Sequence, residues 1–124
     1  MRLCFALALL LLAVGCEEET PKQETAFERD LEMKLFACSG CHGGENPEAG
    51  LDMRDPFALV DVQSKQVNMK LIEPGNHLRS YLWHKVAGTQ GIAGGLGQRM
   101  PVNQQWTEEE LALLGRWIDL GLPK

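Results

Sequence analysis

The stretch Cys38-Ser39-Gly40-Cys41-His42 decides how this 124-residue chain is interpreted. It places two thiols three positions apart, about one helical turn, and an imidazole directly follows the second thiol. The two residues between the thiols are small and flexible, which permits a tight turn. Three groups capable of covalent or metal-binding chemistry are therefore neighbours in the sequence, and they are the first candidates for a functional site.

An amphipathic helix is predicted to lead into this motif. Thr25 and Glu28 fit a capping box, in which a hydroxyl and a carboxylate satisfy free backbone N–H groups at the start of a helix. Apolar side chains then recur at every fourth position, at Phe27, Leu31 and Leu35. The same face reaches Cys38 three residues later, so we expect this thiol to point into the core.

The spacing C-x-x-C-H is typical of the covalent attachment of a c-type haem. Each thiol can bond one vinyl carbon of a single porphyrin, and the adjoining imidazole then lies beneath the iron. The sequence therefore predicts one covalent haem c, attached through Cys38 and Cys41, with His42 as a ligand of the iron.

Three other interpretations of the cysteine pair fit less well. A thioredoxin-like redox pair needs a preceding strand in a βαβ unit, whereas the preceding segment here has a helical period. A zinc site needs four ligands, and His77 and His84 would lie about 10 Å apart along one helix. A structural disulfide across so short a loop would stabilise little.

The first residues look like an export signal rather than part of the domain. Arg2 is followed by a 12-residue apolar run, residues 3–14, which is too short to span a bilayer. The run ends at Gly15-Cys16 before three glutamates, and this pattern resembles the lipobox of bacterial lipoproteins. We therefore expect residues 1–15 to be a signal peptide, Cys16 to carry lipid, residues 16–24 to form a flexible tether and residues 25–124 to form the domain. An ordinary secretory signal, with Cys16 left free, is the alternative.

Charge and cysteine usage agree with an exported protein that does not bind nucleic acid. Loss of residues 1–15 removes Arg2 and leaves 11 basic against 17 acidic residues, a net charge of −6. Cys4 lies in the signal and Cys16 takes the lipid, so only the motif pair remains, without a second pair for a disulfide framework. The expected location is the periplasmic side, anchored by lipid to the inner or outer membrane.

Two further long helices are predicted in the domain. One runs from His77 to Val86 between Asn76 and Gly88, with Leu78, Leu82 and Val86 in the core and Tyr81 beside them. The other begins with the capping box Thr107 to Glu110 and ends at Gly121 and Pro123. Its apolar face carries Leu111, Leu113, Leu114, Trp117, Ile118 and Leu120.

The remaining segments read as loops with one short helix. Asp55 and Pro56 are suited to begin a helix over residues 57–60, and residues 61–75 show no helical period. Five glycines between residues 88 and 97 exclude a regular element, and so long a loop in a small domain is usually functional.

A six-coordinate haem needs a second axial ligand, and Met100 is the preferred candidate. It lies 58 residues after His42, just past the glycine-rich loop, and Pro101 stiffens the chain behind it. Met69 and His84 stay open as alternatives, and His77 is a weaker one. Trp83, Trp106 and Trp117 are expected to be packing residues, and the last two could also line the haem pocket.

These features together resemble a class I c-type cytochrome domain, in particular the single-haem domains of planctomycete and myxobacterial proteins. The resemblance rests on the helix leading into CSGCH, the stretch LIEPGNHLRSYLWHK, the GQRMP loop and the final helix TEEELALLGRWIDLG. It implies an all-α fold of three main helices and a short one around one haem. It also implies thioether links at Cys38 and Cys41, His42 as proximal ligand, Met100 as distal ligand, and packing of the first helix across the last.

The resemblance further implies a carbonyl that accepts the proximal imidazole N–H, for which Pro47 is the candidate. It implies an electron carrier, not an enzyme, that exchanges electrons with redox partner proteins. A haem peroxidase, a ligand sensor with five-coordinate iron, and a non-haem interaction module with an incidental motif are the alternatives.

Overall fold

The computed structural model describes residues 26–123, and side chains from residue 29 onward. Three α-helices are present in this part of the chain: α1 (Ala26–Ala37), α2 (Tyr81–Ala87) and α3 (Glu108–Asp119). Four short 3-10 helices join them: η1 (Cys38–Gly40), η2 (Glu48–Gly50), η3 (Pro56–Leu59) and η4 (His77–Arg79). The described residues contain no β-strand, only three isolated bridges between residues 60 and 80. The all-α prediction is confirmed.

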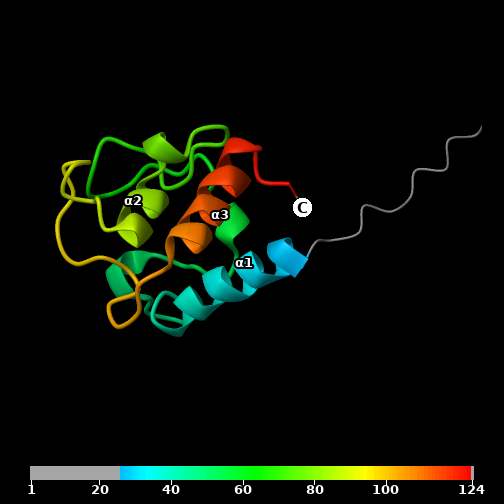
Figure 1. Cartoon of the computed structure of the whole chain (residues 1–124). Helices are drawn as coiled ribbons and strands as arrows, with labels where there is room; N and C mark the ends of the chain where they lie inside the picture. Colours follow the sequence, from blue (N-terminus) through cyan, green and yellow to red (C-terminus); the bar gives the residue numbers. More distant parts are fainter. Residues whose placement is uncertain (1–25, 124) are drawn as a thin grey trace, which may run out of the picture.

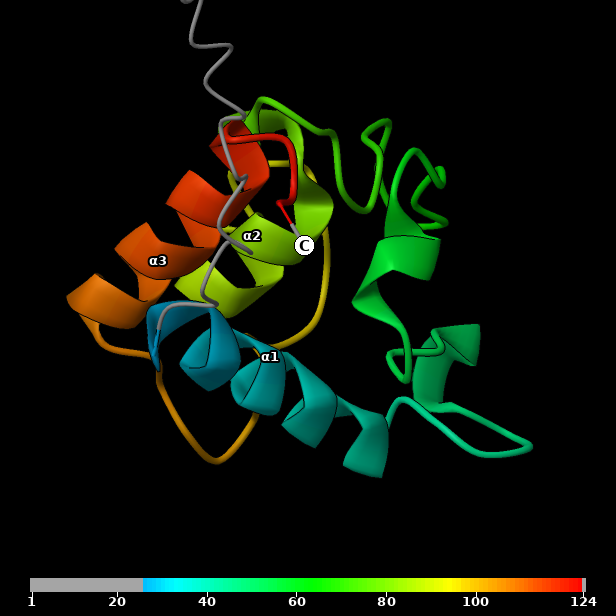
Figure 2. The same ribbon diagram turned by 90° about the vertical axis from the view of Figure 1, so that its right-hand side faces the viewer.

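The first and last helices pack against each other, as the resemblance implied. Figures 1 and 2 show α1 crossing α3, and α2 also packs against α3. Leu31 and Leu35 of α1 are fully buried against this interface, and the Lys34 ammonium lies 2.5 Å from a carboxylate oxygen of Glu110 on α3. The predicted stripe on α1 is therefore confirmed at Leu31 and Leu35, whereas Thr25 and the side chain of Phe27 lie outside the described residues.

The start of α3 confirms the predicted capping box. The Thr107 hydroxyl accepts the Glu110 N–H (3.2 Å), and a Glu110 carboxylate oxygen accepts the Thr107 N–H (2.8 Å). Leu114, Trp117 and Ile118 are buried, and Leu111 and Leu113 are half-buried. The assignment of Leu120 to the same face is wrong, because its side chain is 69% exposed.

The helix expected from His77 to Val86 is broken into two pieces. Asn76 does cap the first piece, η4, by accepting the Arg79 N–H (3.2 Å), and Gly88 does end α2 in the left-handed conformation at φ 79°. Between them Ser80 has extended backbone angles, so η4 does not continue the helical rotation of α2. For this reason Leu78 is 57% exposed rather than in the core, whereas Tyr81, Leu82 and Val86 are buried as predicted.

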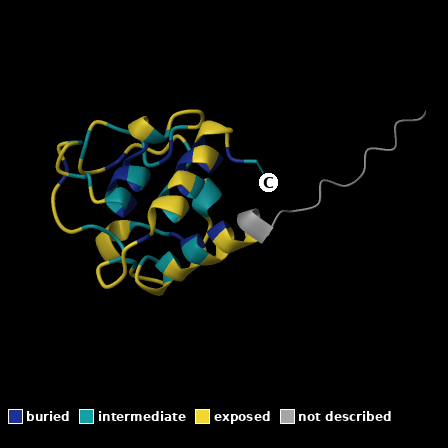
Figure 3. Ribbon diagram, in the orientation of Figure 1, coloured by how far each residue is buried: buried dark blue, intermediate teal, exposed yellow. Residues whose placement is uncertain are grey.

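The loops follow the predictions closely. Asp55 accepts the Phe57 N–H (2.9 Å) and begins η3 directly before Pro56. Residues 61–75 and the glycine-rich stretch 88–97 contain no helix or strand, and the loops are mostly exposed (Figure 3). Within the described residues, every helix is too short to cross a bilayer.

Candidate functional site

The C-x-x-C-H motif forms a compact turn at the end of α1. Residues Cys38–Gly40 continue the chain as η1, directly after the last residue of α1. The Cys38 carbonyl accepts two N–H groups, from Cys41 (3.3 Å) and from His42 (2.9 Å). These bonds keep the two thiols and the imidazole on one short, folded segment.

The two thiols are free and lie in different environments. Cys38 is half-buried and packs against the core cluster of the α1 face, as the sequence predicted, and its Sγ donates to the Lys34 carbonyl (3.7 Å). Burial raises the pKa of the Cys38 thiol above its ordinary value. Cys41 is exposed. One sulfur thus faces the interior and the other faces solvent, and neither is consumed by a disulfide.

The imidazole of His42 is held by a single backbone carbonyl. Its Nδ1 donates to the carbonyl oxygen of Glu48 at 2.9 Å. Because a carbonyl can only accept, the proton of the neutral ring lies on Nδ1, and Nε2 then holds the lone pair that can bind a metal. The His42 carbonyl in turn accepts the Met53 N–H (2.6 Å), so the backbone of this residue is also fixed.

The predicted role of Pro47 as the carbonyl acceptor is wrong. The Pro47 carbonyl accepts the N–H of Gly50 (2.9 Å), and the next residue, Glu48, supplies the oxygen to His42. The turn η2 and the bond from Glu48 N–H to the Cys41 carbonyl (3.0 Å) aim the Glu48 oxygen at the ring. Any residue can supply a main-chain carbonyl, whatever its side chain. The turn residues Asn46 and Pro47 therefore indicated the right segment but not which residue accepts the His42 hydrogen bond.

Gly43, directly after the candidate ligand, allows the chain to pass close to the motif turn. A Cβ added there would lie 2.5 Å from the carbonyl oxygen of Ser39, closer than a side chain can normally approach. A Cβ at Gly40, in the same turn, would meet nothing within 4 Å.

We therefore predict that Gly43→Ala destabilises the haem-loaded protein by about 1–3 kcal/mol, because the backbone of the motif must shift to relieve the clash. Urea unfolding of Gly43→Ala and of the wild type measures this loss of stability. Gly40→Ala is the matched control and should unfold at nearly the wild-type urea concentration. Equal midpoints for Gly43→Ala and Gly40→Ala would show that the turn does not need a glycine at position 43.

Met100 follows the glycine-rich loop and is half-buried. Its N–H donates to the Lys85 carbonyl of α2 (2.9 Å), which fixes the end of the loop against that helix. Within the described residues, no hydrogen bond joins the two candidate iron ligands, His42 and Met100, to each other. The His42 ring is bonded to Glu48, and the Met100 backbone is bonded to Lys85.

The other methionines are placed differently. Met53 is 1% exposed and belongs to the hydrophobic core, whereas Met33 is 64% exposed on α1. Met69 is half-buried, and its carbonyl accepts the N–H of Ser64 and the side-chain amide of Gln63, each at 2.9 Å.

His84 lies in the interior rather than at the surface. It is 8% exposed, and both of its ring nitrogens are hydrogen-bonded: Nε2 to the Leu78 carbonyl (2.9 Å) and Nδ1 to the Thr89 hydroxyl (2.8 Å). The carbonyl requires a proton on Nε2, so Nδ1 accepts from Thr89. This arrangement leaves His84 without a free ring nitrogen for a metal.

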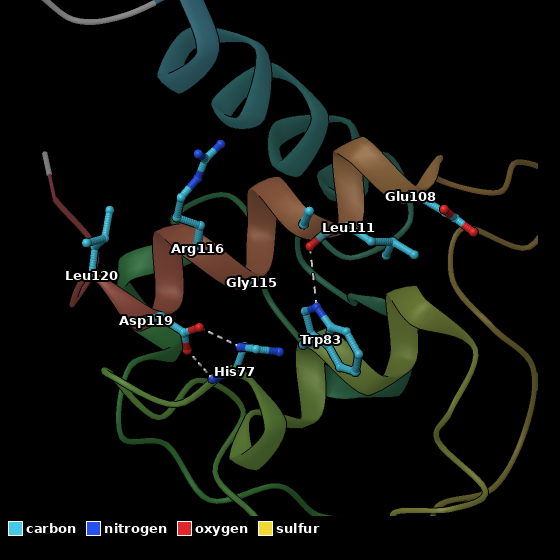
Figure 4. A pocket seen from close by; sticks show the side chains of 9 residues that line it. His77, Trp83, Glu108, Leu111, Gly115, Arg116, Asp119 and Leu120 are labelled. Atoms are coloured by element: carbon cyan, nitrogen blue, oxygen red, sulfur yellow. Dashed lines mark hydrogen bonds and ion pairs between the residues drawn. The ribbon is translucent and has the colours of Figure 1, made fainter.

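His77 lies in a shallow groove between η4, α2 and α3 (Figure 4). Its Nδ1 is 2.7 Å from an Asp119 oxygen, and its ring meets the edge of Trp83 with 4.9 Å between centroids. The Trp83 N–H donates to the Leu111 carbonyl at 3.4 Å. None of the residues that line this groove belongs to the C-x-x-C-H motif.

The tryptophans are packing residues. Trp117 is buried, with 5.5 Å between its ring centroid and that of Phe57 in an edge-to-face contact, and Trp106 is buried with the Lys34 ammonium 5.5 Å from its ring centroid. Among the described residues, no group of three or more His, Cys, Asp or Glu side chains could hold a metal ion without a cofactor. The zinc interpretation of the cysteine pair therefore gains no support there.

The residues present fit a covalently bound haem. Two free thiols on one turn can be bonded at two points of a porphyrin, and the imidazole beside them has a fixed orientation and a free Nε2. The helices and the motif together define a c-type cytochrome-like domain.

Comparison with known proteins agrees with this class. Residues 38–92 match the family described as Planctomycete cytochrome C, and this match supports a c-type cytochrome-like domain in the chain. The match begins at the first cysteine of the motif and ends within the glycine-rich loop, before Met100. No curated protein and no solved structure matches the chain. Proteins of the cytochrome c family typically carry electrons by means of haem rather than act as enzymes.

Proposed function

We propose that this chain is a one-electron carrier with a single haem c. Cys38 and Cys41 hold the haem by thioether bonds, and His42 and Met100 are the axial ligands of its iron. The observation that carries the proposal is the orientation of His42, whose Nδ1–H is bound to the Glu48 carbonyl while Nε2 stays free beside two free thiols. A rigid, correctly protonated imidazole next to two attachment points is what a haem-binding turn requires.

Each motif residue has a distinct task in this proposal. Cys38 would attach the haem on the side of the core, and Cys41 would attach it on the solvent side. The hydrogen bond to Glu48 fixes the tautomer and the plane of the His42 ring. The turn that presents all three is held by the Cys38 carbonyl, so attachment and ligation depend on the same local structure.

We prefer Met100 to His84 and Met53 as distal ligand because those two side chains are engaged elsewhere, and Met69 stays an alternative. Both ring nitrogens of His84 are hydrogen-bonded, and Met53 is part of the core. The backbone of Met100 is tied to α2, and Pro101 restricts the following φ angle, so the thioether is presented from a fixed chain segment. When bound, haem c supplies a one-electron Fe(III)/Fe(II) couple, whose potential a methionine ligand raises.

The cellular setting of the carrier is part of the same proposal. Residues 1–15 act as an export signal, and lipid on Cys16 tethers the domain at the periplasmic side of a membrane, where it meets redox partner proteins. The support is the apolar run that ends in Gly15-Cys16 and the acidic stretch after it. These residues lie outside the part of the chain that the structure describes.

The test is an optical spectrum of the exported, purified protein. We expect a Soret band, a reduced-minus-oxidised difference and a pyridine haemochrome of the c type in the wild type. In Met100→Ala the haem should remain attached, but the charge-transfer band of the methionine–iron bond should disappear.

The outcomes separate the alternatives. Rapid binding of carbon monoxide to the wild type, equal to that of Met100→Ala, would indicate an open sixth position, as in a ligand sensor or a peroxidase. A colourless protein from a host that attaches haem would contradict the proposal as a whole.

A further inference from the structure

The segment that carries Met100 is a closed loop on one end of α2. Residues 88–99 leave the helix at Gly88 and return to it at Met100, whose N–H donates to the Lys85 carbonyl (2.9 Å). Figure 1 shows this loop, in yellow, extending away from α2 and turning back. Since both ends of the loop meet the last turn of the same helix, contacts in that turn decide where Met100 lies.

The first half of the loop is fixed by hydrogen bonds within the loop and by contacts with two residues of α2. Thr89 is bonded to His84, and the Gly95 backbone lies directly against the Tyr81 ring, so that a Cβ there would collide with the phenol. Within the loop, the Gln90 carbonyl accepts the N–H of Gly95 (2.7 Å), and the Gln90 side-chain amide donates to the Gly97 carbonyl (3.0 Å).

The second half is held by Lys85. Its ammonium donates to the carbonyl of Gln98 (2.6 Å) and points also to that of Leu96 (3.4 Å). Burial lowers the pKa of this half-buried ammonium, which fits a group turned toward the protein rather than toward water. Among the described residues its ammonium takes part in no ion pair, so the two loop carbonyls are its partners.

Lys85 therefore contacts the chain on both sides of Arg99. Its side chain binds the carbonyls before that residue, and its own carbonyl binds the N–H directly after it. The Arg99 side chain meanwhile lies over Gly88, at the start of the loop. One residue thus fixes the approach of the chain to Met100 as well as the Met100 backbone.

We propose that Lys85 is the positioning residue for Met100, and that its ammonium keeps the loop closed so that the thioether stays at a constant distance from the iron. The inference rests on the proposed function, since it takes Met100 to be the distal ligand. Charge-assisted hydrogen bonds to carbonyls are stronger than neutral ones, so their loss should raise the population of the open loop.

The test compares Lys85→Met with the wild type in the haem-loaded, full-length protein. Methionine keeps the apolar stem and the main-chain carbonyl but removes the ammonium. We expect the Met100 amide to exchange its hydrogen about tenfold faster, and excess imidazole to replace the sixth ligand of the ferric protein about tenfold faster, because a charge-assisted bond is lost. Lys85→Arg, which can still donate to both carbonyls, should restore slow exchange and slow replacement.

A matched control removes a lysine elsewhere. Lys70→Met also deletes one positive charge, from an exposed ion pair with Asp61, and should leave both rates at wild-type values. If Lys85→Met does not fold, Lys85→Gln is measured in its place, because glutamine also removes the charge but keeps a polar side chain.

Met100→Ala separates the two proposals. Fast imidazole binding to Met100→Ala together with wild-type rates in Lys85→Met would overturn the role of Lys85 and leave Met100 as the ligand. Slow binding to Met100→Ala would overturn the ligation itself, and the positioning role with it. Fast binding to both variants, with rescue by Lys85→Arg, supports the inference.

Discussion

The Cys38→Ser/Cys41→Ser double variant is expected to lose all covalently bound haem. Each thioether needs one sulfur of the motif, and both thiols are free on the same turn. Serine keeps the size and the turn but cannot form a thioether. Haem staining after denaturing electrophoresis measures this directly, because only covalently attached haem stays with the chain.

The same double variant should also fold poorly. A domain of about 100 residues has a small core, and a bound haem adds a large apolar surface to it. We therefore expect the far-ultraviolet circular dichroism signal of the double variant to be weaker and its thermal unfolding less cooperative than in the wild type.

Ser39→Ala is the control for this experiment, since it changes the linker but keeps both thiols. It should stain for haem as strongly as the wild type. Haem that survives denaturation of the double variant would show that the attachment point lies elsewhere in the chain, and the proposed function would have to be abandoned.

The motif and the final helix could be predicted from the sequence because their signals are local. The capping box from Thr107 to Glu110 contains its own partners, and both of its hydrogen bonds are present. Likewise the spacing of Cys38, Cys41 and His42 requires only a short turn, which the Cys38 carbonyl provides.

The break before α2 could not be predicted, because it depends on hydrogen bonds that the apolar period of the segment does not encode. Ser80 is fully buried, and its hydroxyl accepts the Glu73 N–H (2.8 Å) and donates to the Asn76 carbonyl (3.0 Å). These bonds hold Ser80 in an extended conformation within a stretch whose apolar period predicts one continuous helix. The error at Leu78 follows from this.

The acceptor for His42 was missed for a related reason. The resemblance pointed to a proline carbonyl, yet Glu48, one residue later, holds the ring. Which carbonyl faces the imidazole is set by the backbone of η2, where Ala49 has a positive φ of 57°. No side chain in this segment encodes that geometry, so only the structure identifies the residue.

The wrong assignment of Leu120 to the buried face of α3 is explained by the turn that ends this helix. The chain leaves α3 through a Schellman motif: Gly121 at φ 81° donates to the Ile118 carbonyl (3.0 Å), and Leu122 donates to the Trp117 carbonyl (2.9 Å). This turn swings Leu122 back onto the core, where it is 8% exposed. Leu122 therefore occupies the place that the helical period assigns to Leu120.

Leu114→Ala and Leu120→Ala should consequently differ sharply in stability, although the helical period puts both leucines on one face. Leu114 is 0% exposed, so its truncation leaves a cavity and should lower the free energy of unfolding by about 2–5 kcal/mol. Leu120 is 69% exposed, and its truncation should change that free energy by no more than about 0.5 kcal/mol.

Urea unfolding of the haem-loaded variants, followed by circular dichroism, measures the difference as a shift of the midpoint at equal slope. The pair is matched in chemistry and in helix, so burial is the variable that distinguishes its members. A large cost at Leu120 would mean that this side chain is covered, and that Leu122 does not replace it in the core. A small cost at Leu114 would mean that the packing of α1 against α3 contributes little, because Leu114 belongs to the core cluster that this interface encloses.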